Sequence, residues 1–454
     1  MNAVNSETQV REESSDMNIK KSHTKRGRAW TAVLGGVGVV FAIAVLNKTP
    51  GAQSFPSGSD GSDGALTVAA NAGTIVFDPM DIARWGKVLD PDGDGVYNFT
   101  TITINSGSTL KLQGDKVNRP AFWLASGDVL INGTLDLSGA PGSAPHDLSL
   151  RRVVAIPGSG GNSGGAGGNA GQVPPVPSTP GEGPGGGVGG VNCPVGGSVF
   201  CGKGGTFGGN RYEIPLVGGS GGEGALMQWP AYAFYGGGAG GGAILIGSST
   251  SITLNGIVAA NGGQGGIDNC CGALGGGGSG GGIRLVAPVL AGGGTLNVAG
   301  AGGSSGGAAG NGGTGMVRLE AFQISSSFVF TAGGAFVTRG TPVDPSTLRP
   351  ASSLRVTSID GVPVPPNASG SFVLPDVTIS KNSAVSVDIQ ATGIPPGTIV
   401  TLQVYPQSPT DPTIVNLPTA QATLSGTLQS STATATFTFP YGFSRGFVRA
   451  SWTQ

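Results

Sequence analysis

A unit of two short strands followed by glycine recurs between residues 241 and 334 and limits the folds open to this chain. Three copies read AILIGSSTSITLNGIVAANGG, IRLVAPVLAGGGTLNVAGAGG and VRLEAFQISSSFVFTAGG, and they align on Leu245, Leu285 and Leu319. A fourth copy, AFWLASGDVLINGTLDLSG, occupies residues 121–139. A unit of this size cannot bury its apolar face alone, so we expect neighbouring copies to stack on one another.

Apolar and polar residues alternate along the strands of these copies. In VRLEA, Val317 and Leu319 are predicted to point into the core, whereas Arg318 and Glu320 point outward. A period of two is typical of a half-buried strand, and the Gly and Asn residues between strands suit tight corners. The sequence therefore predicts an all-β fold with a parallel β-solenoid (β-helix), in which the three aligned leucines form one apolar column. Antiparallel hairpins in a sandwich are the alternative, and they would separate those leucines.

Glycine-rich insertions interrupt the repeats. The chain has 87 glycines among 454 residues, and the longest insertion covers residues 140–240. It is either a disordered linker or closely packed glycine backbone with few side chains. Shorter insertions at 262–282 and 301–316 leave the repeat at the same point. Insertions at one point of a repeat gather on one face, so that face is the predicted location of a binding site.

Changes in composition predict the domain boundaries. Residues 76–336 contain the repeats and form the predicted Gly-rich β-helix domain. Residues 47–75 are rich in Gly, Ser and Asp, which predicts a flexible tether. Residues 350–454 contain short strands separated by Pro and Gly turns, and they include no cysteine. This pattern predicts an Ig-like β-sandwich that lacks the inter-sheet disulfide.

The N-terminal region predicts a membrane attachment. Residues 1–28 are polar and end in a basic run, whereas residues 29–46 are uncharged and mostly apolar. At about 1.5 Å per residue, a helix over 29–46 nearly spans a hydrocarbon core of about 30 Å. The basic flank predicts a cytoplasmic tail at 1–28 and a transmembrane helix or signal-anchor at 29–46. The expected location is the cell membrane, single-pass with the C-terminal bulk outside the cytoplasm, or secreted if the segment is cleaved.

The four cysteines suit an oxidising compartment outside the cytoplasm. Cys193 and Cys201 bracket the short loop CPVGGSVFC, and a disulfide between them is the predicted pairing. Cys270 and Cys271 are adjacent, and they would then form a vicinal bridge or stay free. Cross-pairing between the two loops and a zinc site are the alternatives, although the chain lacks CxxC spacing for zinc.

The run DPDGDGVYN at residues 90–98 matches the pattern of a calcium-binding loop. It has carboxylates at positions one, three and five, a glycine at six and an oxygen ligand at nine, which suits the hard oxygen ligands that calcium prefers. It resembles the short calcium loops of dockerin and thrombospondin type 3 repeats. The candidate ligands are Asp90, Asp92, Asp94, Val96 and Asn98. Thr101 stands where such loops carry a carboxylate at position twelve, so a solvated Asp-Gly turn is the alternative reading.

Two further groups of side chains are candidates for polysaccharide binding. Trp229, Tyr232 and Tyr235 are either an aromatic platform for sugar rings or a hydrophobic plug on the flank of the solenoid. Arg284 and Arg318 occupy matching outward positions on adjacent copies. They either bind an acidic polysaccharide, or act with a carboxylate in a lyase-like groove, or lie on a solvated face.

Other classes of function lack their required residues. A net charge of −1 argues against nucleic acid as a partner. The chain has two histidines, His23 and His146, so a His-based nucleophilic triad is disfavoured. The Gly-x-Gly strings do not end in GKS or GKT, which excludes a phosphate-binding loop of that type. The sequence therefore does not indicate an enzyme.

The phrases DGVYNFTTITI, GDVLINGTLDLSG and GGGGSGGGIRLVAP resemble glycine-rich bacterial surface proteins with a right-handed parallel β-helix of pectin-lyase-like architecture. The resemblance implies a fold and an exterior location, and it does not extend to the catalytic carboxylate cluster of pectin-degrading enzymes. We therefore expect a non-catalytic, membrane-anchored surface protein that is structural or adhesive, with a polysaccharide or a protein as its partner. A polysaccharide-binding or polysaccharide-degrading β-helix protein is the alternative. No cofactor is expected beyond structural calcium.

Overall fold

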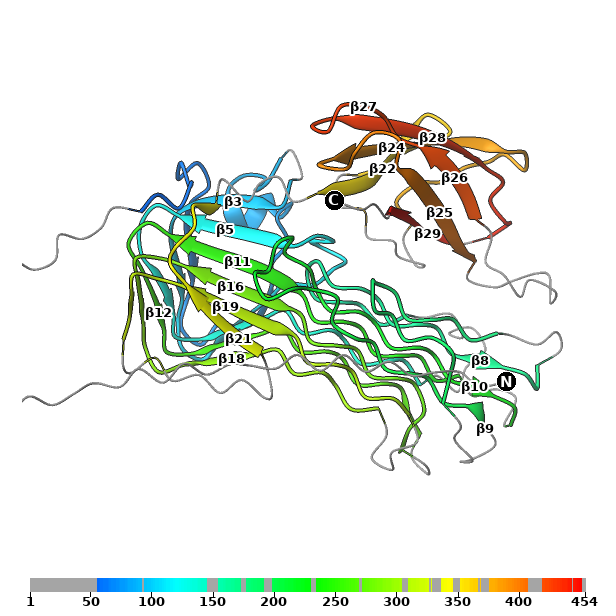
Figure 1. The fold of residues 1–454 in the computed structure, drawn as a ribbon, viewed down its shortest axis with the longest axis horizontal. Helices are drawn as coiled ribbons and strands as arrows, with labels where there is room; N and C mark the ends of the chain where they lie inside the picture. The colour runs from blue at the N-terminus through cyan, green and yellow to red at the C-terminus, as the bar shows by residue number, and fades with distance from the viewer. Residues whose placement is uncertain are drawn as a thin grey trace, which may run out of the picture. The chain divides into compact units, whose positions relative to one another are not determined.

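The repeating unit contains three short strands rather than two. In a computed structural model of the chain, each unit runs through three successive strands and then enters a glycine-rich excursion (Figure 1). Three units are complete: β5 (Ala121–Ala125), β6 (Val129–Ile131) and β7 (Thr134–Asp136); β11 (Ala243–Ser248), β12 (Ser251–Leu254) and β13 (Ile257–Ala259); β16 (Gly282–Val286), β17 (Val289–Ala291) and β18 (Thr295–Asn297). The structure describes residues 55–91, 94–144, 154–172, 177–191, 198–229, 234–268, 272–303, 309–325, 328, 336–345, 352–365, 368, 375–406, 419–442 and 444–450.

Equivalent strands of successive units pair in parallel. The first strands form the order β3-β5-β11-β16-β19-β21, and Figure 1 shows most of them side by side. The second strands continue the same 11-stranded sheet, because the long strand β3 pairs with both β5 and β6. The third strands form a separate 5-stranded sheet, β18-β13-β7-β4-β2. The other strands of these two sheets are β1 (Gly64–Val68), β2 (Gly73–Val76), β3 (Val96–Ile104), β4 (Ser108–Lys111), β19 (Met316–Glu320), β20 (Gln323–Ile324) and β21 (Phe336–Gly340). The predicted parallel stacking of units is confirmed, and the hairpin alternative is wrong for these strands.

The predicted column of three leucines is wrong at one position. Leu285 pairs with Leu319 on one side, but on the other side it pairs with Ile246. Leu245 pairs with Arg284 and lies on the opposite face of the sheet. A shift of one residue moves a side chain to the other face of a strand, so the inward column contains Ile246 in place of Leu245.

The core lies between the two sheets and is filled by inward side chains of every unit. Its largest members are aromatic: Phe77, Tyr97, Phe99 and Trp123 are at most 1% exposed. The Phe77 ring lies 5.2 Å from that of Tyr97 and 5.3 Å from that of Trp123, in edge and tilted contacts that stabilise aromatic pairs. These rings occupy the units nearest the N-terminus, beside the short helix α1 (Ile82–Trp85).

In their described residues, the glycine-rich insertions are packed backbone, as the second of the two sequence-based interpretations predicted. From residue 236 to 241, successive N–H groups donate to three different neighbouring segments and then repeat the cycle. The acceptors are the carbonyls of Ser143, Gly165, Gly276, Ala140, Asn162 and Ser279, at 2.8–3.1 Å. A period of three matches the three residues per turn of a polyproline II helix, in which backbone groups point outward in every direction. Each segment therefore bonds to several neighbours at once, and Figure 1 shows these segments running side by side.

Close approach of these segments explains why they contain glycine. A Cβ on Gly237 would lie 1.9 Å from the carbonyl oxygen of Gly222, and one on Gly238 would lie 1.9 Å from that of Gly263. Only hydrogen fits in such a space. Short strands occur farther along the excursions: β8 (Gly168–Asn169), β9 (Ser198–Phe200), β10 (Leu226–Met227), β14 (Ile267–Asp268) and β15 (Gly272–Ala273).

Part of the predicted tether at 47–75 is ordered, which corrects that prediction for its described residues. β1 pairs in parallel with β3, and β2 pairs in parallel with β4. Ser57 is fully buried, and its hydroxyl donates to the carbonyl of Ala125 at 2.7 Å. A Gly- and Ser-rich composition suggested flexibility, but sheet pairing supplies these residues with backbone hydrogen bonds.

The described residues from 352 onward form two antiparallel sheets around one core. One sheet has the order β23-β22-β24-β28-β27 and the other β26-β25-β29. Both contribute to a cluster that includes Val387, Leu402 and Phe437. The strands are β22 (Ser353–Ile359), β23 (Val362–Pro363), β24 (Val385–Thr392), β25 (Ile399–Pro406), β26 (Thr419–Thr423), β27 (Ser425–Gly426), β28 (Ser431–Phe437) and β29 (Ser444–Ala450).

The predicted membrane helix at residues 29–46 and the tail at 1–28 lie outside the described residues. Among the residues that the structure describes, no helix has both the length and the apolar character needed to cross a bilayer.

Candidate functional site: a polar groove along the stacked units

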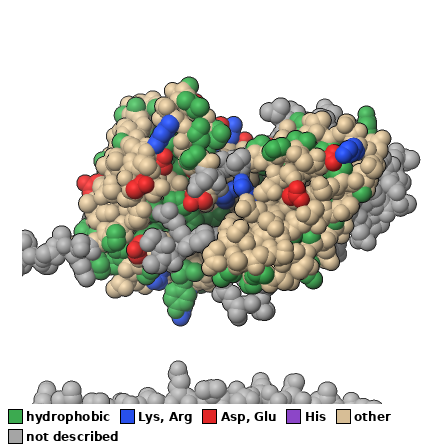
Figure 2. Space-filling view, turned by 90° about the horizontal axis from the view of Figure 1, so that it is seen from above, with side chains coloured by type: hydrophobic (Ala, Val, Ile, Leu, Met, Phe, Trp, Pro, Cys, Tyr) green, Lys and Arg blue, Asp and Glu red, His purple; other side chains and the backbone are tan. Residues whose placement is uncertain are grey.

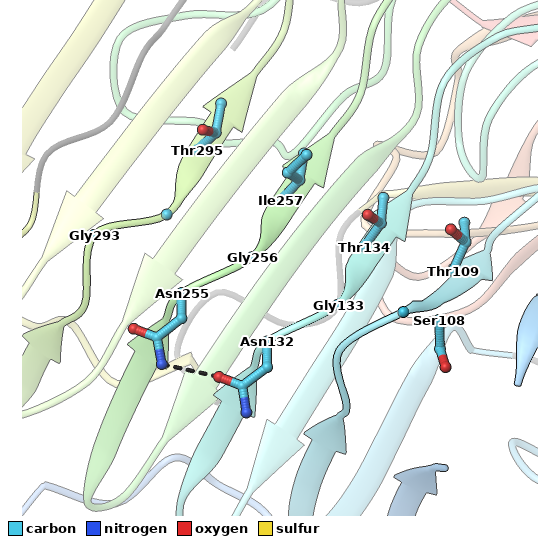
Figure 3. Close-up of a pocket in the computed structure, with 12 residues that line it drawn as sticks. Ser108, Thr109, Asn132, Gly133, Thr134, Asn255, Gly256, Ile257, Gly293 and Thr295 are labelled. Atoms are coloured by element: carbon cyan, nitrogen blue, oxygen red, sulfur yellow. Dashed lines mark hydrogen bonds between the residues drawn. The ribbon is translucent and has the colours of Figure 1, made fainter. Parts of the chain in front are cut away.

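A groove of about 430 Å³ follows the corner between the second and third strands of successive units. Each of four units contributes a tripeptide to it, and none of the lining residues is charged. The tripeptides are Gly107-Ser108-Thr109, Asn132-Gly133-Thr134, Asn255-Gly256-Ile257 and Gly293-Gly294-Thr295. Figure 3 shows these tripeptides side by side, each where one strand ends and the next begins.

One row of side chains runs along the groove in strict register. Thr109 pairs with Thr134, Thr134 with Ile257, and Ile257 with Thr295. Their inward neighbours, such as Leu135, are fully buried, so the row itself faces outward. Neighbouring strands lie about 4.8 Å apart, so the row repeats at that interval. The groove therefore offers three hydroxyls and one isoleucine at regular spacing.

Two asparagines form a second row. Nδ2 of Asn255 donates to Oδ1 of Asn132 at 2.8 Å, as the dashed line in Figure 3 marks. The backbone beneath them is held in the same way in both of these units, since the N–H groups of Asn132 and Gly133 both donate to the carbonyl of Ile104. The N–H groups of Asn255 and Gly256 both donate to the carbonyl of Ile131, each at 2.8 Å. These repeated hydrogen bonds fix the backbone positions from which the two Asn side chains extend.

The glycines of the groove are required by close packing of adjacent corners. A Cβ on Gly256 would lie 1.9 Å from the carbonyl oxygen of Gly133, and one on Gly133 would lie 2.4 Å from that of Asn105. Any larger residue would separate the units at this corner. The floor of the groove is therefore bare backbone between two rows of hydroxyl and amide groups, which can donate and accept hydrogen bonds.

In the described residues of the candidate calcium loop, the Asp side chains accept hydrogen bonds from backbone N–H groups of the same loop. Asp90 is 4% exposed, and its two carboxylate oxygens accept from the N–H groups of Asp94 (2.8 Å) and Gly95 (3.0 Å). Oδ1 of Asp94 accepts from the N–H of Val96 at 2.8 Å. The backbone N–H of Asn98, the last candidate ligand, donates to Asp63 at 2.7 Å.

Calcium binding at this loop remains a prediction. Asp92 lies outside the described residues, and the described part of the chain contains no group of three acidic, His or Cys side chains placed to hold a metal. The Arg119 guanidinium interacts electrostatically with Asp90, and a cation at that position competes with a metal ion.

Cys201 is fully buried and takes part in a disulfide. Cys193, Cys270 and Cys271 lie outside the described residues, so its pairing with Cys193 remains a prediction.

The prediction of an aromatic platform is wrong for Tyr235, one of its three residues. Tyr235 is 1% exposed and packs in a cluster with Met227, Leu274 and Cys201. Its ring therefore has no face free for a sugar, and the plug alternative describes it better. Trp229 is 73% exposed, and Tyr232 lies outside the described residues.

Arg284 and Arg318 pair on adjacent strands as predicted, but they do not lie on a solvated face. Arg284 is 1% exposed, and only 12% of the Arg318 side chain is exposed. Both guanidinium groups reach Oε1 of Glu320, at 2.8 and 2.9 Å. A segment of the glycine-rich insertion covers them, which strand alternation alone did not indicate.

The Gly and Asn residues between strands were predicted to form tight corners, and Asn132-Gly133 and Asn255-Gly256 lie at such corners, but they were not predicted to be parts of a site. The usable signal was the repeat alignment, because it places these two Asn-Gly pairs at equivalent positions. At the predicted binding face, the described residues of the insertions form packed glycine backbone, and a binding role for that face remains a prediction.

No family model, no curated protein and no solved structure matches this chain.

Proposed function

We propose that this chain is a non-catalytic, membrane-anchored surface protein that holds an extended, uncharged polysaccharide along the polar groove. In this proposal the parallel units form a β-solenoid outside the cytoplasm, residues 29–46 attach it to the membrane, and the C-terminal sheets form an Ig-like β-sandwich. The single observation that carries the binding role is the in-register row of Thr109, Thr134 and Thr295 in a groove without charged residues.

The chemistry of the groove favours a polyhydroxylated polymer. Hydroxyl and amide groups exchange hydrogen bonds with sugar hydroxyls in both directions. Their repetition at about 4.8 Å suits a partner that is itself extended and repetitive. The absence of lining charges disfavours an acidic polymer, whose carboxylates would lose hydration without gaining a cationic partner. Charged side chains are also few on the face presented in Figure 2.

A polysaccharide-degrading activity has less support. Glycoside hydrolysis requires two carboxylates that reach the substrate. Within the described residues, Glu213 and Glu320 both lie near Arg284, but each is 1% exposed. A sugar chain cannot reach either carboxylate while the covering segment is in place.

Binding to arrayed oligosaccharides tests the proposal. We expect the full chain in detergent to bind neutral hexose or pentose oligomers more tightly than matched uronic acid oligomers. Thr134→Val removes one groove hydroxyl at constant shape and should weaken binding by about three- to tenfold. Thr253→Val is the matched control, because Thr253 faces outward from β12 but does not line the groove. Equal weakening by both variants, or preference for uronic acid oligomers, would contradict the proposal.

A further inference from the structure

A short segment of the long insertion covers the outward face of the first strands. We define residues 210–217 as the strap. Leu216 is 4% exposed and belongs to an apolar cluster with Phe122, Leu245 and Val286, which are outward residues of β5, β11 and β16. The strap therefore shields apolar side chains that would otherwise face water.

Few bonds tie the strap backbone to the strands below. Nη1 of Arg284 donates to the carbonyl of Tyr212 at 3.0 Å. Oγ1 of Thr338, on β21, donates to the carbonyl of Arg211 at 2.7 Å. The Tyr212 ring packs between cations, with the guanidinium carbons of Arg211 and Arg318 at 4.6 and 5.7 Å from its centroid.

Glu213 is the unusual member of the strap. It is 1% exposed, and neither of its carboxylate oxygens has a hydrogen-bond partner among the described residues. It lies against the backbone of β16, because a Cβ on Gly282 would come 2.5 Å from its Oε2. Its backbone also has a positive φ of 52°, which is uncommon for a residue with a side chain. The fold therefore holds the Glu213 carboxyl group in a buried position, although it has no hydrogen-bond partner there.

The two arginines beside Glu213 share the carboxylate of one other residue, Glu320, and among the described residues Nε of Arg284 has no hydrogen-bond partner. Arg284 of β16 and Arg318 of β19 both pair with Glu320 of β19. On the strap itself, the Arg211 guanidinium lies over the ring of the exposed Tyr212, and β21 contributes the carbonyl of Arg339, which accepts from Arg318 at 3.1 Å. Arg284 favours the charged form of Glu213, but it makes its bonds to Glu320 and to the strap backbone.

We propose that the strap is a proton-controlled cover, closed over the sheet while Glu213 carries its proton and released when Glu213 loses it. An ionised carboxylate without hydrogen bonds is strongly disfavoured in a buried site, whereas water would solvate it once the strap lifts. Release would expose the apolar outward face that includes Leu245 and Val286.

The direction of the pH dependence follows from burial. Desolvation raises the pKa of Glu213 well above its ordinary value of 4.5, and Arg284 opposes this with a smaller effect. The closed form then binds a proton that the open form releases. Closure is most stable below the ordinary pKa, weakens as pH rises above it, and is weakest once the raised pKa is passed.

Cleavage by trypsin after Arg211 measures strap opening, because a protease needs a locally unfolded segment. The full chain in detergent would be digested from about pH 5 to about pH 9, with each rate divided by that of a short reporter peptide at the same pH. We expect the normalised rate of the wild type to rise with pH, by at most about tenfold per pH unit, as release of one proton requires. A flat wild-type profile would overturn the proposal.

Two variants test whether Glu213 causes the pH dependence of strap cleavage. Glu213→Gln cannot ionise and should give a flat profile at the low-pH wild-type rate. Thr338→Val removes a bond that does not titrate, so it should raise cleavage by a similar factor at every pH and keep the wild-type slope. A wild-type slope in Glu213→Gln, or loss of the slope in Thr338→Val, would show that another group controls the strap.

Discussion

Asn255 donates a hydrogen bond from its side-chain amide to the side-chain oxygen of Asn132, 123 residues earlier in the chain, at 2.8 Å. The two residues occupy the same corner of successive units, so the pair links one unit to the next outside the backbone ladder.

Removing this pair should have a small effect on stability, because Asn255 is exposed and water replaces its partner. Asn255→Ala and Asn132→Ala should each lower the free energy of unfolding by about 0.5–1.5 kcal/mol, and the double variant should lower it by less than the sum. Denaturant midpoints of the four proteins provide the measurement. Fully additive effects would show that the two side chains do not interact.

Close packing of the glycine-rich segments predicts a sharp difference between two glycines. Gly237→Ala places a Cβ 1.9 Å from the carbonyl oxygen of Gly222 and should destabilise the protein by about 1–3 kcal/mol. Gly302→Ala is the control, because a Cβ there meets nothing within 4 Å and Gly302 has no positive φ. Similar thermal midpoints for both variants would contradict the packed arrangement of the insertion.

The two readings of residues 90–98 predict different behaviour of one variant. If Asp90 caps the turn through its bonds to Asp94 and Gly95, Asp90→Ala should lower stability by about 1–3 kcal/mol with or without calcium. We expect this outcome, because Arg119 supplies a positive charge at the loop. Thermal unfolding in calcium and in chelator measures it. A loss confined to the calcium-containing sample would favour a metal site instead.

Asp388 on β24 should titrate at a lower pH than an ordinary aspartate. Hydrogen bonds from the hydroxyls of Ser358 (2.5 Å) and Thr434 (2.8 Å) lower its pKa from the ordinary value of 3.8. Its contribution to stability is therefore present above that value and is lost as pH falls through the lowered pKa. NMR titration of the Asp388 carboxyl in wild type and in Ser358→Ala provides the test. In Ser358→Ala, the pKa of Asp388 should move back toward 3.8. An unchanged pKa would show that the hydrogen bond from Ser358 does not cause the lowering.

Much of the fold could be predicted from local patterns. Alternation along VRLEA predicted a strand, and β19 lies there. The repeats predicted parallel stacking, and equivalent strands pair in that way. The groove was harder to predict, because its residues are ordinary corner residues in the sequence. They become a site only when four units bring their corners into one row.

The sequence alone determined that short strands with an apolar face recur and must stack on one another, because alternation and repetition are local properties of the chain; the parallel direction of that stacking was decided against the hairpin alternative by the structure. The tertiary structure decided which side chains share a face. Register placed Ile246 rather than Leu245 beside Leu285, and the strap turned the outward position of Arg284 into a buried one. Local pattern cannot specify these outcomes, because a strand defines two faces but does not determine what packs against either of them.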